Sequence, residues 1–159
     1  MKKITVMIAA LFALSAPAAS FSASDGGHGG GSHGKGHSDH QGSVAHDEVV
    51  DGVKVTFKIM SMKEHMQAMG MELPKGMKET HHLSIEFKDV KSGKALVDGE
   101  VKLKVQNPDK SDQTKDLMAM QGHFGTDLDL SKKGKYGMMS KFQLKDGKVR
   151  SAKFWYSVK

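Results

Sequence analysis

Apolar and polar residues alternate along most of the chain after residue 48, and a period of two predicts strands with one buried and one solvated face. The expected strands cover residues 48–59, 80–90, 101–105, 117–121, 124–130, 136–144 and 149–158. Turn signals such as Asp146-Gly147 separate them, and residues 107–115 are interpreted as a polar connection. This spacing favours an all-β protein, an antiparallel immunoglobulin-like β-sandwich of about six or seven strands.

One segment replaces this alternation with a helical period. Ser61 and Glu64 fit a capping box and Gly70 suits the left-handed residue that ends a helix, so a short helix is expected over residues 62–69. Four side chains would share one face of it: Met62, His65, Met66 and Met69. These side chains are candidate metal ligands, because packing alone does not explain why leucine is absent from all four positions. A methionine stripe is also a common lid over a hydrophobic core, and both interpretations stay open.

The first residues are typical of a secretory signal peptide. Two lysines precede an apolar run of about a dozen residues, and Ala16-Pro17-Ala18 offers small residues for cleavage. The run is shorter than the ~20 apolar residues that span a bilayer. We therefore expect residues 1–23 to be removed on export, and the mature chain to be a soluble periplasmic protein without a membrane span.

Residues 24–47 are rich in glycine, serine and histidine, a composition that favours disorder. The segment carries five candidate metal ligands: His28, His33, His37, His40 and His46. Neutral imidazole binds Cu(II), zinc or nickel, and a flexible histidine-rich tract can wrap an ion without a preformed site. The alternative is a plain linker with incidental histidines. Residues 48–159 then form the β-sandwich domain.

Composition excludes several classes of function. The chain has no cysteine, which rules out disulfides, thiol redox chemistry, iron–sulfur clusters, cysteine-ligated zinc and blue-copper sites. The formal charge of +6 comes from lysines spread along the strands without arginine clusters, so nucleic acid is not an expected partner. The sequence contains no catalytic triad, nucleophile elbow or phosphate loop, and an enzyme is not expected.

Methionine and histidine concentrate in two places. Residues 60–82 hold six methionines and three histidines, His65 among them, and a smaller cluster comprises Met118, Met120 and His123. Thioether and imidazole groups together suit copper best. We therefore expect the β domain to bring the two clusters together around a metal ion.

The strand periods constrain which of these residues can meet. His81 lies in line with the inward-facing residues of its strand and His82 faces the other way, so only one of them is expected in an inward-facing site. His81 could equally bond a loop carbonyl. Met118 and Met120 share a face, and a bulge at Gly122 would bring His123 to their side. Phe124-Gly125 could equally let the chain turn there.

Two acidic residues near the second cluster are excluded from the expected site. Asp127 and Asp129 lie too far from the methionines in the pattern to be included. Trp155 is interpreted either as an edge residue or as part of the packing between sheets.

The segments T-H-H-L-S-I-E-F, V-K-S-G-K-A-L-V-D-G-E-V-K-L-K-V, M-A-M-Q-G-H-F-G and G-K-Y-G-M-M-S-K-F occur in this order. Over residues 50–158 the chain resembles small periplasmic immunoglobulin-like metal-handling domains, the YtkA-like and CopC-like copper proteins and, more loosely, P19-type iron/copper transport proteins. The resemblance implies metal ligation near His81 or His82, near Met118 and Met120, and near His123. It does not account for the helix-spaced methionines or for the glycine-histidine tail.

The sequence thus predicts a periplasmic metallochaperone. It would bind Cu(I) through methionines with a histidine and Cu(II) through histidines, and pass copper to a periplasmic or membrane transport partner. Two alternatives stay open: a non-catalytic envelope interaction module with a methionine-rich docking surface, and a protein that binds iron, zinc or nickel.

Overall fold

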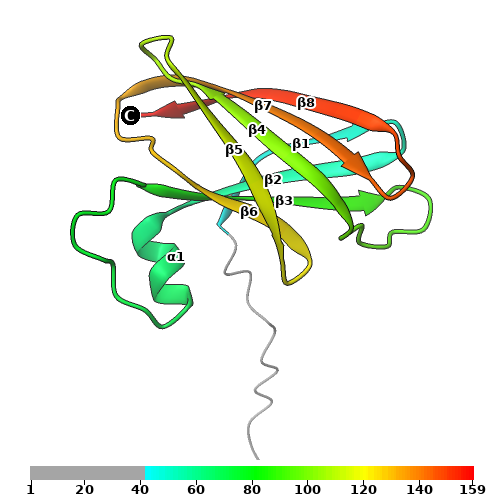
Figure 1. Cartoon of the computed structure of the whole chain (residues 1–159), viewed down its shortest axis with the longest axis horizontal. Helices are drawn as coiled ribbons and strands as arrows, with labels where there is room; N and C mark the ends of the chain where they lie inside the picture. The colour runs from blue at the N-terminus through cyan, green and yellow to red at the C-terminus, as the bar shows by residue number, and fades with distance from the viewer. Residues whose placement is uncertain (1–41) are drawn as a thin grey trace, which may run out of the picture. The chain divides into compact units, whose positions relative to one another are not determined.

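The structure, a computed structural model, describes residues 42–159, which form the body of the protein (Figure 1). The predicted signal peptide and four of the tail histidines, His28, His33, His37 and His40, lie outside the described residues. Within residues 42–159, no helix is long and apolar enough to cross a membrane.

Strands dominate the described chain, with one short helix after the second strand (Figure 1). In order they are β1 (Ser43–Val50), β2 (Val53–Ser61), α1 (Met62–Ala68), β3 (His81–Asp89), β4 (Gly99–Gln106), β5 (Asp112–Met120), β6 (His123–Leu128), β7 (Gly134–Leu144) and β8 (Val149–Val158).

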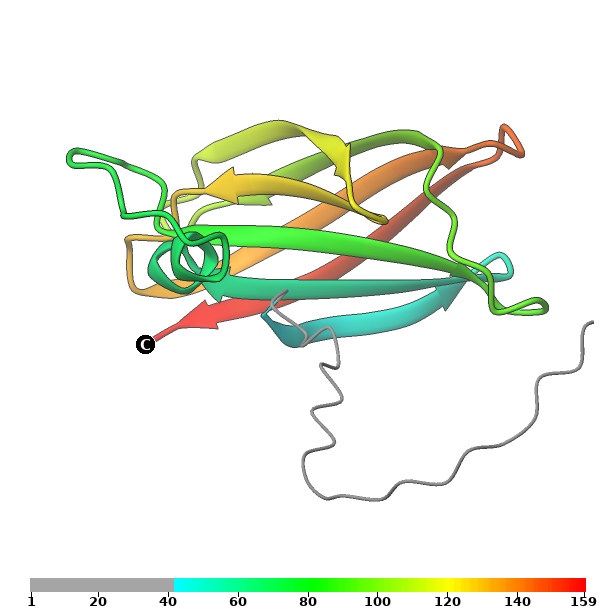
Figure 2. The ribbon, with the colours of Figure 1, turned by 90° about the horizontal axis from the view of Figure 1, so that it is seen from below.

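All strand pairs are antiparallel, in the spatial order β1-β2-β3-β6-β5-β4-β7-β8. Residues 112–117 of β5 pair with β4 and residues 118–120 pair with β6, so β5 passes from one layer to the other. Figure 2 shows the two layers, with β2, β3 and β6 on one side and β4, β7 and β8 on the other. The predicted all-β antiparallel sandwich is confirmed, with eight strands among the described residues where six or seven were expected.

The additional strand is β1, and it corrects the expected disorder of residues 24–47, because Ser43 to Asp47 belong to this strand. Asp51 and Gly52 form a tight turn with positive φ angles of 44° and 76°, which returns the chain antiparallel along β2. His46 stacks on Phe154 of β8 with ring centroids 5.0 Å apart. Backbone pairing and this ring contact, which links the two edge strands, outweigh the polar local composition.

Inward-facing side chains of both layers form the hydrophobic core, and the alternation correctly predicts which residues these are. Leu83, Ile85 and Phe87 of β3 are all buried in it. The connection expected over residues 107–115 is shorter than predicted, because β5 already begins at Asp112. Its polar residues still form a strand because their backbone pairs with β4.

The predicted helix is confirmed, and its capping explains its length. Ser61 and Glu64 form the capping box, and the left-handed Gly70, with φ of 68°, ends the helix. Met62 and Met66 are buried where the helix lies against the outer face of β2 and β3. One part of the outward sheet face is therefore covered, which strand alternation alone does not predict.

Candidate metal centre

The candidate site lies on the outer face of the β2–β3–β6 layer, beneath α1. Met60, His82 and Asp127 stand opposite one another in adjacent strands, so all three point away from the sandwich core. An outward residue of a sheet is ordinarily solvated, but the helix covers His82 and leaves it only 4% exposed.

The His82 ring is held in one orientation by Asp127. Its Nδ1 lies 2.7 Å from Oδ1 of Asp127. Because an ionised carboxylate only accepts hydrogen bonds, Nδ1 is the donor, and in the neutral ring Nε2 keeps its lone pair. The Nε2 atom is buried and has no hydrogen-bond partner among the described residues. A carboxylate that orients a histidine in this way is typical of metal sites.

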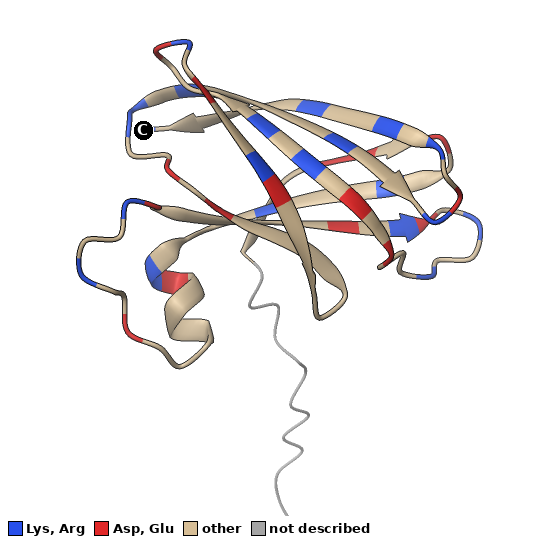
Figure 3. Ribbon diagram, viewed as in Figure 1, with Lys and Arg blue, Asp and Glu red and all other residues tan. Residues whose placement is uncertain are grey.

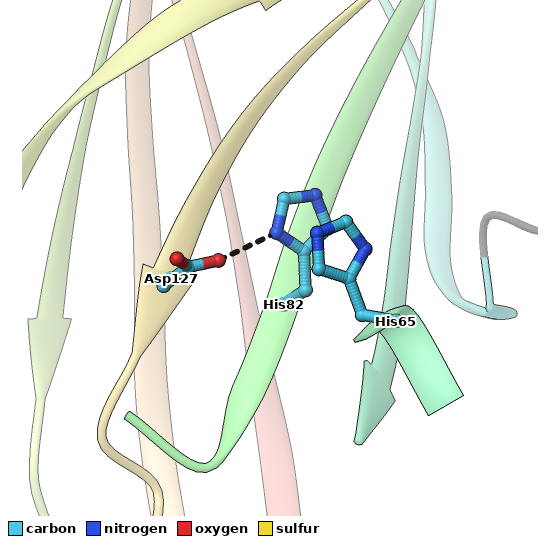
Figure 4. A group of neighbouring side chains, drawn as sticks. All are labelled: His65, His82 and Asp127. Atoms are coloured by element: carbon cyan, nitrogen blue, oxygen red, sulfur yellow. Dashed lines mark hydrogen bonds and ion pairs between the residues drawn. The ribbon is translucent and has the colours of Figure 1, made fainter. Parts of the chain in front are cut away.

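His65 reaches the same place from the helix (Figure 4). Its ring stacks on that of His82, with centroids 3.7 Å apart and planes within 4° of parallel. One donor atom from each of His65, His82 and Asp127 lies within 4.8 Å of the other two, a spacing that a single metal ion could bridge. The helical period places His65 here because residues 62 and 66 anchor the same face beneath the helix.

The β5–β6 hairpin contributes Met120 and His123. Gln121 and Gly122 form a tight turn with φ angles of 40° and 88°, and Met120 pairs directly with His123. This turn replaces the predicted bulge, and it places both side chains on one face because antiparallel partners point the same way.

Met120 reaches His82 across the backbone of Gly125, which has no side chain. A Cβ atom built on Gly125 would lie 3.0 Å from Nε2 of His82 and 3.2 Å from Cε of Met120. The thioether end of Met120 and the unpartnered nitrogen of His82 therefore both lie over the same glycine.

The surroundings of two histidines of the site, His65 and His123, favour their neutral form. Partial burial lowers the pKa of His65 and of His123 below the ordinary value, and the neighbouring His82 lowers both further. Lys58 and Glu86 form a half-buried ion pair of 3.1 Å at the edge of the site. Glu86 acts on His123 in the opposite direction, which makes its pKa less depressed. Neutral imidazole is the form that binds a metal ion, so the lowered pKa values leave both rings able to act as ligands down to a lower pH.

The remaining predicted ligands lie elsewhere. Met118 and Met69 are exposed, at 71% and 51%, and Met62 and Met66 are buried under the helix. His81 hydrogen-bonds Thr80 through Nδ1, at 2.7 Å. Of the two adjacent histidines, the one that joins His65 and Asp127 is the outward-facing His82, whereas the sequence led us to expect an inward-facing site.

His46 lies in β1 and packs against Phe154, so it belongs to the β-sandwich and not to the disordered segment expected over residues 24–47. Asp127, excluded at the level of sequence, belongs to the cluster. The sequence did carry a signal for it, since residues 123 and 127 are four apart on one strand and therefore share a face.

No protein-family model and no curated protein matches the sequence. The fold is similar to that of a copper-bound variant of FetP from uropathogenic Escherichia coli strain F11, with a TM-score of 0.55 and 13% identity over 74% of this chain and 94% of that one. A DUF4426 family protein from Pseudomonas aeruginosa PAO1 gives a TM-score of 0.53 at 9% identity, over 71% and 96% of the two chains.

A copper-bound variant of Campylobacter jejuni P19 is also similar, with a TM-score of 0.50 and 12% identity over 72% of this chain and 95% of that one. These similarities confirm the predicted likeness to P19-type proteins at the level of the fold.

Proposed function

We propose that this protein binds a copper ion at the His65–His82–His123–Met120 cluster and carries it within the periplasm. One observation supports this most strongly. Nε2 of His82 is buried without a partner in the part of the chain that the structure describes, is oriented by Asp127 on the other side of the ring, and lies beside the thioether of Met120. A buried polar atom left unpaired costs about 1–3 kcal/mol, and a metal ion would satisfy it.

The donor set favours Cu(I). Three imidazoles and a thioether are neutral, borderline-to-soft ligands, a combination suited to a soft monovalent ion. Asp127 would act by holding His82, with the ion on the far side of the ring. Two of the solved structures with a similar fold are copper-bound, which agrees with this choice.

A carrier role agrees with the exposure of the site. Met120 and His123 are partly exposed on a hairpin, so an incoming ion can reach them before it reaches the buried His82. The histidines of residues 24–41 would collect copper and supply it to this cluster, and a membrane transporter or periplasmic acceptor would receive it. The predicted signal peptide supports the periplasmic location.

Anaerobic competition with a chromogenic Cu(I) chelator tests the proposal. We expect the chain that begins at Ser24 to compete for one Cu(I) with high affinity, and Met120→Leu to weaken that binding at least ~10-fold. Met139→Leu is the matched control, because Met139 and Met120 are 36% and 37% exposed but lie on opposite faces of the sandwich. Equal loss in both variants, or in neither, would contradict the assignment.

A second candidate is a zinc site made of His65, His82 and Asp127, whose donor atoms lie within 4.8 Å of one another. Imidazole and carboxylate suit zinc, and this set does not need Met120. Zinc binding that is as tight as Cu(I) binding and unchanged by Met120→Leu would favour this candidate.

A further inference from the structure

Positive charge is concentrated in the last 29 residues, which comprise β7, β8 and the segments beside them. Residues 131–159 contain nine lysines and arginines and a single acidic residue, Asp146, for a formal charge of +8. Residues 42–130 contain twelve basic and fifteen acidic residues, for a formal charge of −3. The charge of the described chain is therefore strongly asymmetric, and blue bands run along β4, β7 and β8 in Figure 3.

The register of the sheet brings two of these lysines, Lys141 and Lys153, beside two lysines of β4 on one surface, the outer face of β4, β7 and β8. Lys104 pairs with Met139, which pairs with Lys153, and the neighbouring row brings Lys102 beside Lys141. All five residues point away from the core and are exposed. On β4, Lys102 and Lys104 are paired with Asp116 and Asp112 of β5, but these ion pairs are exposed and weak.

Trp155, the only tryptophan of the chain, lies on this face in the edge strand β8 and is 67% exposed. Its ring lies over Gly137, where an added Cβ would be 3.1 Å from the Cζ3 atom. A shallow groove of about 270 Å³ surrounds it, lined in part by Met139, Lys153 and Gln106. Met139 and Val149 are further exposed apolar residues of the same face.

We propose that the outer face of β4, β7 and β8 docks on the surface of an anionic lipid bilayer, with Trp155 at the level of the headgroups. The negative surface potential of an anionic bilayer attracts lysine side chains without requiring a fixed contact geometry. Tryptophan is enriched at membrane interfaces. The metal centre lies on the opposite face of the sandwich, beneath α1, so it would remain open to incoming copper (Figure 1).

The choice of cation favours a membrane over an acidic protein. Recognition of carboxylates in a protein partner typically uses arginine, whose planar fork makes bidentate bonds. The only arginine of the sequence, Arg150, is 5% exposed and already paired with Asp146. The exposed cations of this face are all lysines spread over three strands, an arrangement that matches diffuse, laterally mobile negative charge.

Vesicle flotation tests this, with the chain that begins at Ser24, in EDTA, and with unilamellar vesicles of phosphatidylglycerol and phosphatidylcholine or of phosphatidylcholine alone. We expect binding only to the anionic vesicles, weakened by salt, with a blue shift of the tryptophan emission. Each lysine contributes roughly fivefold to the partition coefficient, so Lys141→Glu/Lys153→Glu is expected to weaken binding about 25-fold or more. Lys63→Glu/Lys75→Glu makes the same change of net charge on and after α1, and is the matched control.

Three results would overturn the proposal. The first is equal binding to the two kinds of vesicle, or binding to neither, which would leave an acidic protein as the partner of this face. The second is an equal loss of binding in the two double variants, which would assign the effect to net charge. The third is binding with unchanged emission of Trp155, which would place the contact on another surface.

Discussion

Gly125 allows the candidate metal centre to be perturbed without removing any ligand. It lies on β6 opposite Met118 and Ser84, and its bare backbone lets Met120 approach His82. In Gly125→Ala the new methyl group would lie 3.0 Å from both Cε1 and Nε2 of His82, closer than ordinary van der Waals contact. The His82 ring and the Met120 thioether must therefore each move away from the new methyl group by a few tenths of an ångström.

The effect on stability is expected to be modest. Overpacking typically costs about 1–3 kcal/mol, and replacing glycine by alanine returns about 0.4–1 kcal/mol by restricting the unfolded chain. A net loss of about 0–2.6 kcal/mol in the free energy of unfolding follows, and the protein stays folded. Metal affinity should respond more, because ligand distances tolerate shifts of only about 0.2 Å, and we expect Cu(I) binding to weaken ~10- to 100-fold.

The assay is Cu(I) competition on the folded variant, with unfolding in urea as the check of stability. Gly137→Ala is the control, since its new Cβ also meets a ring, 3.1 Å from Cζ3 of Trp155, but on the opposite face. We expect Gly137→Ala to leave the Cu(I) affinity unchanged. Wild-type affinity in a folded Gly125→Ala protein would refute the claim that Met120 and His82 bind one ion.

Three further predictions concern single features of the fold and site. Asp127→Asn removes the carboxylate that orients His82, and we expect Cu(I) affinity to fall ~10- to 100-fold; a change below that range in the chelator competition would remove Asp127 from the site. Ser61→Ala removes the helix cap and should lower the free energy of unfolding by about 1 kcal/mol in urea, against no change for Ser157→Ala. The lowered pKa values of His65 and His123 mean that the unfolded chain protonates first, so the melting temperature should fall as the pH drops below 6.5; a flat profile would contradict this.

Much of the fold follows from the sequence because alternation and turn chemistry agree. The capping box of Ser61 and Glu64 and the Asp146-Gly147 turn each lead to the element that they predict. The turn at Asp51-Gly52 carried the same signal as the one at Asp146-Gly147, yet β1 was missed. Its inward positions include His46 and Glu48, which are polar and do not show the apolar alternation of a buried strand.

The site was harder to predict because it lies on the face that alternation assigns to solvent. His82 is buried only because α1 folds over it, and that contact depends on tertiary packing. Met120 and His123 meet through the register of a two-residue turn at Gln121-Gly122, which the glycine pattern alone does not distinguish from a bulge at Gly122. Strand alternation places Asp127 on the same face as His123. Its distance from the methionines along the sequence is a poor guide to its distance from them in the folded sheet.

The proposed copper ion binds between α1 and the β5–β6 hairpin. Cu(I) is diamagnetic, so an anaerobic titration can be followed through the histidine ring signals in NMR spectra of the chain that begins at Ser24. We predict that one equivalent shifts the ring signals of His65, His82 and His123, and leaves those of His46 and His81 in place. Shifts confined to the tail histidines, with His82 unchanged, would contradict it.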